Sequence, residues 1–197
     1  MRSPTRRAPV NKHAAQGRTV QAKRRIHKGR LVDLNVETAA MPDGSYLDLE
    51  IVRHPGGAAI VAINERGEVC LLRQFRHAVG EARLWELPAG CIDASDESPL
   101  ATATRELREE AGVSAESWRT LGTLLSSPGF CDERLHLYLA GGLTHVGSSQ
   151  HDDEYIEIHW LPFENALKMA AAGEITDAKT VVGLFRAKGF VEESAGR

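Results

Sequence analysis

The sequence predicts an α+β fold in which a mixed β-sheet is sandwiched between α-helices (an α/β/α arrangement), with an antiparallel strand region ahead of it. Strand-length segments with alternating or continuous apolar residues fill the chain between residues 31 and 87. Segments with helical periodicity follow at 98–112, 163–172 and 177–188, and further strand-like segments separate the first of them from the other two. This order of elements favours helices on the faces of one sheet.

The strand-like segments form two expected hairpins and several single strands. Residues 31–38 and 46–52 alternate apolar and polar side chains around the turn sequence Met41-Pro42-Asp43-Gly44, which predicts a hairpin. Residues 58–63 and 69–74 flank a second turn at 64–67 and predict another hairpin. Single strands are expected at 84–87, 118–125, 135–140 and 155–161.

The N-terminal segment has an unusual charge. The 197-residue chain has a net charge of -3, yet residues 1–30 contain ten Lys or Arg and no Asp or Glu. Because this segment also lacks apolar periodicity, we interpret residues 1–30 as a flexible basic tail. A nucleic-acid-binding arm is the alternative that this charge leaves open, and a transit peptide is disfavoured because the segment is neither Ser-rich nor amphipathic.

Composition excludes several classes of protein. No apolar run approaches the ~18 residues of a membrane span, so no membrane association is expected. The three cysteines, Cys70, Cys91 and Cys131, have no C-x-x-C spacing and suggest neither a disulfide framework nor a zinc cluster. Their number and spacing favour a reducing compartment, and we expect a cytoplasmic protein.

The first predicted helix carries three carboxylates on one side. Ser98 is a suitable N-cap, Pro99 suits the first turn and Gly112 ends the pattern. Glu106, Glu109 and Glu110 stand at i, i+3 and i+4, opposite the apolar stripe of the helix. This spacing fits a site for a hard cation such as Mg²⁺. A solvated acidic face, softened by neighbouring arginines, fits the spacing equally well.

The residues around this helix resemble the signature of the Nudix hydrolases. The segment reads Gly90-x6-Glu97-x7-Arg105-Glu106-Leu107-x-Glu109-Glu110-x-Gly112-Val113. The family has five residues between the first Gly and Glu, whereas here there are six. The loop 91–96 therefore contains one additional residue, or Asp96 occupies the position of the family Glu.

Further stretches are similar to the ADP-ribose pyrophosphatase branch of that family. They are residues 73–76, 85–90, 127–130 and 173–179, and Pro128 lies fifteen residues after Val113, where this branch has a proline. The resemblance implies a Nudix fold over 55–190 and a dimerisation hairpin at 31–54 in a homodimer. It also implies metal-dependent hydrolysis of ADP-ribose, or of a related nucleoside diphosphate sugar, to AMP and ribose 5-phosphate.

The resemblance also implies roles for single residues. The metal ligands are Glu106, Glu109, Glu110 and the carbonyl of Ala89, holding Mg²⁺ or alternatively Mn²⁺. Glu154 is the catalytic base, with Asp152 and Asp153 as alternatives in the same loop, and Glu109 is the second catalytic carboxylate. Arg105 pairs with Glu97 or with an acidic neighbour on the helix and orients it. The substrate is bound by Arg76, and by Arg53 and Glu50 where the family takes ligands from a partner subunit.

Three other functions stay open on the sequence. In the first, the enzyme carries out the same hydrolysis on a GDP-sugar, a dinucleotide or another nucleoside diphosphate derivative. In the second, the chain is a Nudix-fold ligand sensor without catalysis, an alternative that the complete set of carboxylates disfavours. In the third, the substrate is capped RNA, an alternative prompted by the positive charge of the N-terminal tail.

Overall fold

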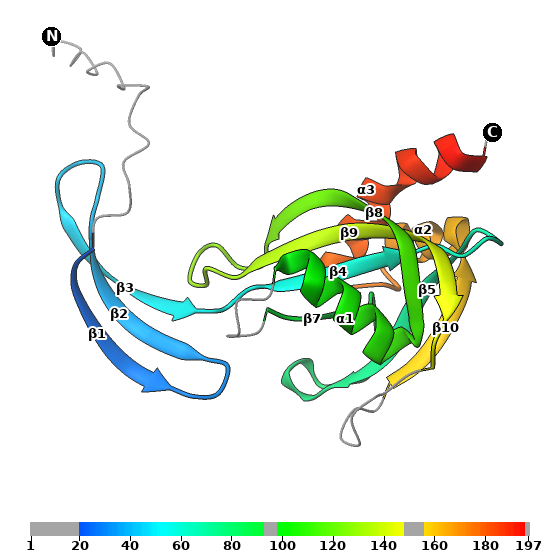
Figure 1. The fold of residues 1–197 in the computed structure, drawn as a ribbon. Coiled ribbons are helices and arrows are strands. Elements are labelled where there is room, and N and C mark those ends of the chain that lie inside the picture. The colour runs from blue at the N-terminus through cyan, green and yellow to red at the C-terminus, as the bar shows by residue number, and fades with distance from the viewer. Residues whose placement is uncertain (1–19, 93–97, 148–155, 196–197) are drawn as a thin grey trace, which may run out of the picture. The chain divides into compact units, whose positions relative to one another are not determined.

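The computed structural model describes residues 20–92, 98–147 and 156–195 (Figure 1). The chain divides into two compact units, one ending at Val52 and the other beginning at Arg53. The described elements of the first unit are the strands β1 (Val20–Lys28), β2 (Asp33–Ala40) and β3 (Tyr46–Arg53), the last of which ends at the boundary. The second unit contains the remaining elements: β4 (Gly57–Ala62), β5 (Glu68–Arg76), η1 (His77–Val79), β6 (Glu81–Glu86), β7 (Ala89–Cys91), α1 (Pro99–Ala111), β8 (Val113–Leu125), β9 (Arg134–His145), β10 (Ile156–Pro162), α2 (Phe163–Ala172) and α3 (Ala178–Ala195).

The first unit is a three-stranded sheet in the order β1-β2-β3. The predicted strands at 31–38 and 46–52 correspond to β2 and β3, but the tail expected over 1–30 is wrong for residues 20–28, which form β1. β1 runs antiparallel to β2 from Val20↔Ala39 to Lys28↔Asp33. Its residues are all exposed, and ion pairs such as Arg25–Asp33 link the two strands. A strand held by its backbone ladder and by cross-strand charges shows no apolar alternation in its sequence.

The second unit contains two sheets, in the orders β7-β4-β9-β8 and β10-β5-β6. β4 runs parallel to β9, whereas β4–β7, β8–β9, β5–β6 and β5–β10 are antiparallel pairs, so the larger sheet is mixed as predicted. The hairpin predicted from 58–63 and 69–74 is wrong. β4 and β5 belong to different sheets and meet in an isolated bridge between Ile63 and Val69. The turn between them is local, but both edges of β4 pair with strands far along the chain.

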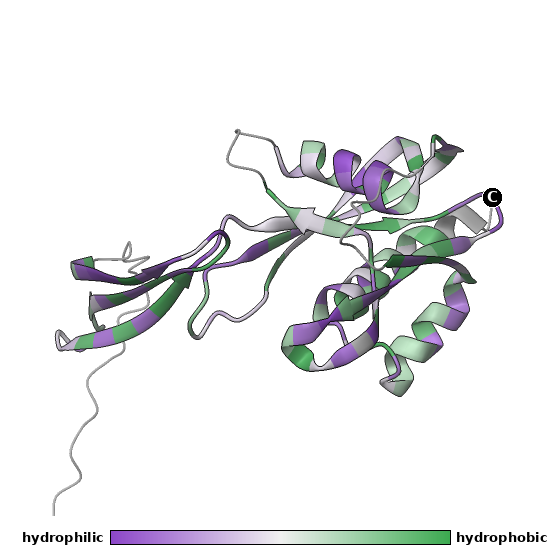
Figure 2. Ribbon diagram, turned by 90° about the horizontal axis from the view of Figure 1, so that it is seen from below, coloured by the Kyte–Doolittle hydropathy of each residue, from purple (hydrophilic) through white to green (hydrophobic). Residues whose placement is uncertain are grey.

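The core forms two apolar layers on opposite faces of these sheets. All six residues of β4 are buried. Ala58, Ile60 and Ala62 pack with Leu107 and other apolar residues of α1, whereas Ala59 and Val61 pack with α2 and α3. Figure 1 shows α1 on one side of the strands and α2 with α3 on the other, and Figure 2 shows apolar and hydrophilic residues alternating along the helices. The predicted α/β/α arrangement is confirmed.

The helix α1 begins and ends where the sequence predicts. Ser98 Oγ accepts a hydrogen bond from the N–H of Ala101 at 3.1 Å, and Pro99 occupies the first turn. Gly112 adopts the left-handed conformation with φ 66° and donates its N–H to the Arg108 carbonyl. These caps fix the register of the helix and therefore the face on which its carboxylates lie.

The two C-terminal helices also confirm the prediction. α2 spans the expected 163–172, and α3 starts at the expected turn but continues beyond 188 to Ala195. Within the described residues, no helix is both long enough and apolar enough to cross a membrane.

Candidate active site

Two of the three carboxylates on α1 are buried. Glu106 is 9% exposed and Glu110 is 5% exposed, and they stand one helical turn apart. Burying a carboxylate is costly unless it is paired or hydrogen-bonded, so these side chains need partners in the fold. Their burial places them on an internal face of the helix, so the solvated acidic face that the spacing also allowed is wrong for these two residues.

The partners come in part from β7, the short strand beside α1. Glu110 Oε2 accepts a hydrogen bond from the backbone N–H of Ala89 at 2.8 Å. Glu106 lies directly against Gly90, because a Cβ at that position would be 1.8 Å from Glu106 Oε1. Only glycine therefore fits at residue 90 while Glu106 keeps this position.

Arg105 links the carboxylates of the same helix. Its Nη1 lies 2.7 Å from Glu106 Oε1 and 2.8 Å from Glu109 Oε2, and its Nη2 donates to the Cys91 carbonyl at 3.4 Å. Burial alone would lower the pKa of Arg105, but the charges and hydrogen bonds of Glu106 and Glu109 outweigh it and raise this pKa. The prediction that Arg105 pairs with its acidic neighbours is confirmed.

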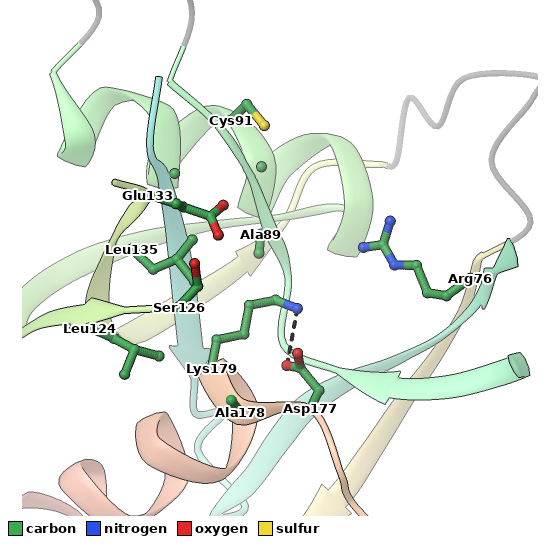
Figure 3. A pocket seen from close by; sticks show the side chains of 12 residues that line it. Arg76, Ala89, Cys91, Leu124, Ser126, Glu133, Leu135, Asp177, Ala178 and Lys179 are labelled. Atoms are coloured by element: carbon green, nitrogen blue, oxygen red, sulfur yellow. Dashed lines mark ion pairs between the residues drawn. The ribbon is translucent and has the colours of Figure 1, made fainter. Parts of the chain in front are cut away.

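A cavity of about 270 Å³ lies beside β7 (Figure 3). Ala89 and Gly90 line it, so the backbone that contacts Glu106 and Glu110 also forms a wall of the cavity. Its charged lining residues are Arg76, Glu133, Asp177 and Lys179, and apolar leucines of β8 and β9 complete part of the wall. The cavity thus has cationic groups within a partly apolar enclosure, which suits a phosphorylated organic ligand.

Both cations of the cavity contact one buried carboxylate. Arg76 donates Nε to Glu86 Oε1 at 2.6 Å and Nη2 to Glu86 Oε2 at 3.0 Å. Glu86 is 2% exposed, and Lys179 Nζ donates to the same Oε2. Burial alone would raise the pKa of Glu86, but the hydrogen bonds and charges of Arg76 and Lys179 outweigh it and hold this pKa below its ordinary value.

The remaining predicted residues lie elsewhere. Arg53 Nη1 pairs with Asp132 Oδ2 at 2.8 Å, and Asp132 Oδ1 accepts the N–H of His54 at 2.9 Å. Glu50 is exposed on β3, in the first unit. Glu154 falls outside the described residues, as do its alternatives Asp152 and Asp153.

The donor set around α1 fits a hard cation in its chemistry. The side chains of Glu106, Glu109 and Glu110 and the backbone of Ala89 offer only oxygen ligands, which Mg²⁺ and Mn²⁺ prefer. In the described part of the chain, no three acidic, His or Cys side chains are grouped closely enough to hold a metal by themselves. A site built here therefore draws on backbone oxygen, water or substrate as well as on side chains.

The family of the chain follows from comparison with known proteins. A family model described as the NUDIX domain matches residues 53–181, which include α1, β7 and all of the residues that line the cavity. The chain belongs to the Nudix family. The match begins at the boundary between the two units.

Two relatives named as ADP-ribose pyrophosphatases match most of the chain. It is 39% identical over 161 residues to an ADP-ribose pyrophosphatase of Mycobacterium tuberculosis, covering 81% of this chain and 77% of that protein. It is 36% identical over 165 residues to an ADP-ribose pyrophosphatase of Bacillus subtilis, covering 83% and 88%. The crystal structure of an ADP compounds hydrolase matches 93% of this chain and 98% of that one with a TM-score of 0.77; at 20% identity this likeness concerns the fold.

Two residues of this Nudix chain that meet Arg76 at the cavity, Glu86 and Lys179, are not singled out by the sequence. Glu86 and Lys179 lie in the stretches 85–90 and 173–179, which carry the resemblance, but neither received a role. A charged residue directly before the apolar pair Leu87-Pro88 was the available signal for Glu86. Nothing in the sequence shows that residues 86 and 179, 93 positions apart, share a hydrogen bond.

Proposed function

We propose that this Nudix enzyme hydrolyses the pyrophosphate bond of ADP-ribose, or of a related nucleoside diphosphate sugar, to AMP and ribose 5-phosphate. One observation carries the proposal: buried Glu106 and Glu110 contact the strand that forms a wall of a cavity containing Arg76 and Lys179. The names of the relatives support ADP-ribose as the first substrate to test.

The metal assignment is part of the same proposal. Glu106, Glu109, Glu110 and the carbonyl of Ala89 would hold Mg²⁺, or Mn²⁺, because they are oxygen donors gathered at one helix face and the adjoining strand. The bound ion would neutralise the charge of the pyrophosphate and activate a water molecule. Arg105 holds the side chains of Glu106 and Glu109 in place.

Two further residues would act on the substrate. Arg76 would bind the diphosphate, because a guanidinium matches phosphate oxygens with two parallel N–H groups and this one lines the cavity. Glu154 would be the base that takes a proton from the attacking water, a role that rests on its place in the sequence between two strands.

We also propose a homodimer that uses the first unit. The described residues of β1–β3 that are buried are polar (Asp33, Asn35 and Glu37), whereas Tyr46 and Leu47 are exposed at 62% and 49%. A three-stranded sheet without an apolar core is not stable alone and needs a further surface to cover it. A second copy of the chain would supply that surface, and Arg53 and Glu50 would then contact the partner's substrate. Light scattering after gel filtration would give twice the mass of the 21.5 kDa chain.

The cysteines support a cytoplasmic location for this enzyme. Cys70, Cys91 and Cys131 are all free thiols, which is typical of proteins in a reducing compartment. Fractionation of cells that express the chain, followed by detection of the protein, would test this.

The decisive experiment measures AMP released from ADP-ribose by the purified protein with Mg²⁺. We expect turnover that EDTA abolishes and that Glu110→Gln lowers by at least about a hundredfold, because a neutral amide is a poor ligand for a hard cation. GDP-mannose, a dinucleotide and capped RNA, assayed side by side, rank the alternatives by kcat/KM. Tight binding of ADP-ribose without turnover would favour the sensor.

A further inference from the structure

We propose that Glu86 and Lys179 are positioning residues that fix the guanidinium of Arg76 for the diphosphate of the substrate. This inference rests on the proposed function and assigns residues to it that sequence motifs do not. The assignment follows from the contacts that bring the end of β5, the end of β6 and the start of α3 together at one side of the cavity.

Glu86 fixes the orientation of the Arg76 side chain. Its side chain is 43% exposed and would sample many rotamers if it had no anchor. Glu86 holds Nε and Nη2 with hydrogen bonds of 2.6 and 3.0 Å, which fixes the plane of the guanidinium. The hydrogen bonds that Glu86 accepts use Nε and Nη2, so among the described residues this pairing leaves Nη1 for phosphate oxygens, and Arg76 lines the cavity (Figure 3).

Glu86 is itself held by a second cation besides Arg76. Its side chain is 3% exposed, so its charge is shielded from water and depends on the cations around it. Lys179, whose side chain is 12% exposed, donates to the oxygen that also receives Nη2 of Arg76. The carboxylate therefore has a cation on each side.

The position of Lys179 is set by the residues at the start of α3. Its Nζ lies 3.0 Å from Asp177 Oδ2, an oxygen that also accepts the N–H and the hydroxyl of Thr180 at 3.0 and 2.6 Å. The hydroxyl oxygen of Thr180 in turn accepts the N–H of Leu87 at 2.8 Å, directly after Glu86. The helix start and the strand end thus form one continuous hydrogen-bonded network.

The charges of these residues predict that loss of Lys179 weakens the binding of the diphosphate. Arg76 and Lys179 together balance Glu86 and Asp177, so the four groups have no net charge. Loss of Lys179 leaves one excess negative charge beside the site where Arg76 meets the diphosphate, and it also loosens Glu86. Both effects weaken the binding of an anion, and both act through Glu86 and Asp177, the partners of Lys179.

The test compares Lys179→Met, Lys179→Arg and a control, Arg83→Met. Arg83 pairs with Glu157 on the same sheet at 2.5 Å, but neither residue lines the cavity. For Lys179→Met we expect the KM for ADP-ribose to rise about tenfold, the size of one charge-assisted hydrogen bond, with kcat within about threefold of the wild type. Lys179→Arg should restore most of the KM, and Arg83→Met should leave both constants unchanged.

A double-mutant cycle shows whether Lys179 acts through Arg76. We expect the combined Arg76→Met and Lys179→Met variant to have a KM close to that of Arg76→Met alone, because the positioning role disappears with the residue that is positioned. Strictly additive losses would overturn the positioning role, as would an unchanged KM in a folded Lys179→Met variant. If Lys179→Met does not fold, Lys179→Gln, which keeps a donor without the charge, takes its place in the same comparison.

A binding measurement separates this inference from the proposed function. Inorganic pyrophosphate is titrated into the wild type and the variants by calorimetry in EDTA. Weaker binding in Lys179→Met and in Arg76→Met alike supports the positioning role even if the wild type releases no AMP from ADP-ribose. Equal pyrophosphate affinity in the wild type and Lys179→Met overturns it, whichever substrate the enzyme cleaves.

Discussion

Gly90 is the residue that allows α1 to approach β7. Glycine is required at residue 90 for a steric reason and not for its conformational freedom, because Glu106 fills the space that any side chain there would occupy. The carboxylate that we assign to a metal therefore owes its position to a residue without a side chain. Such a contact is highly sensitive to substitution because the backbone of β7 also pairs with β4 and cannot retreat freely.

Gly90→Ala should abolish most activity with little loss of folding. The new methyl group would displace Glu106 by more than an ångström, and a displacement of that size can lower kcat about a hundredfold. Steady-state rates with ADP-ribose and a thermal melt would measure the two effects. Gly189→Ala is the matched control, since nothing lies within 4 Å of its new Cβ, and we expect unchanged rates for it. A Gly90→Ala variant with wild-type kcat would contradict the placement of Glu106.

Glu86 should make stability depend on pH in the acidic range. Its pKa is below the ordinary 4.5 in the folded chain, because Arg76 and Lys179 outweigh the effect of burial. The unfolded chain then binds the proton more readily, so the stabilisation is complete above about pH 4.5 and is lost as the pH falls through the folded pKa. The difference in urea midpoint between the wild type and Glu86→Gln should therefore be largest near neutral pH and shrink at lower pH. A difference that stays constant with pH would refute this account.

At the scale of elements, two helices position the site by different means. α1 is set by local signals, a side-chain N-cap at Ser98 and a left-handed glycine at its end. The start of α3 also has a local cap, because Asp177 Oδ2 accepts the N–H of Thr180 at 3.0 Å, but it is in addition joined to the residue after β6 by the hydrogen bond from the Leu87 N–H to the Thr180 hydroxyl. A change at the Ser98 N-cap can therefore weaken α1, and a change at the contact between Thr180 and Leu87 can weaken the start of α3.

Ser98→Ala should destabilise the fold without changing the chemistry. Loss of the hydrogen bond from the Ala101 N–H to Ser98 Oγ should lower the free energy of unfolding by about 1 kcal/mol. Urea denaturation monitored by circular dichroism would measure this. Ser98→Asp, which can accept the same bond, should keep the stability of the wild type. Equal stability of the Ala and Asp variants would mean that this cap contributes nothing.

Thr180→Val should destabilise the junction between α3 and β6. Valine keeps the approximate shape but leaves the buried Leu87 N–H without its acceptor, at a cost of about 1–3 kcal/mol. Thr180→Ser, which keeps the hydroxyl, is the control and should lie closer to the wild type. Hydrogen exchange at the Leu87 amide provides a local readout, and unchanged protection there in Thr180→Val would contradict the proposed junction.

At the scale of the whole molecule, the two units differ in what stabilises them. Every buried apolar side chain among the described residues lies between Ala58 and Ala187, and both apolar layers belong to the second unit. The strands β1–β3 are instead linked by backbone pairing and by ion pairs such as Lys23–Glu37. The sheet also balances part of the positive charge of residues 1–30. Half of the ten basic residues of this segment fall within 20–30, where acidic residues of β2 pair with Lys23, Arg25 and Lys28.

A fragment of residues 53–197 should therefore fold alone. It contains the complete apolar core and the cavity network, so we expect a cooperative thermal transition within about 10 °C of that of the full chain. The same fragment should be monomeric by light scattering if the first unit forms the dimer. A fragment that melts without cooperativity would show that β1–β3 are required for the core, and a dimeric fragment would place the interface elsewhere.

The sequence alone determined those features of this protein that depend on near neighbours. The period, caps and carboxylate register of α1 follow from spacings of three and four residues, and the limits of α2 follow in the same way. The α/β/α class followed from the order of such segments.

Only the tertiary structure decided which strands pair and which charges meet. The choice of β9 and β7 as the neighbours of β4, the inclusion of residues 20–28 in a sheet, and the meeting of Arg76, Glu86 and Lys179 all join distant positions. The physical reason is that the entropy of closing a loop rises only slowly with its length, so distance along the chain barely restricts the choice of partner. Packing of the whole core makes that choice, and no local pattern encodes it.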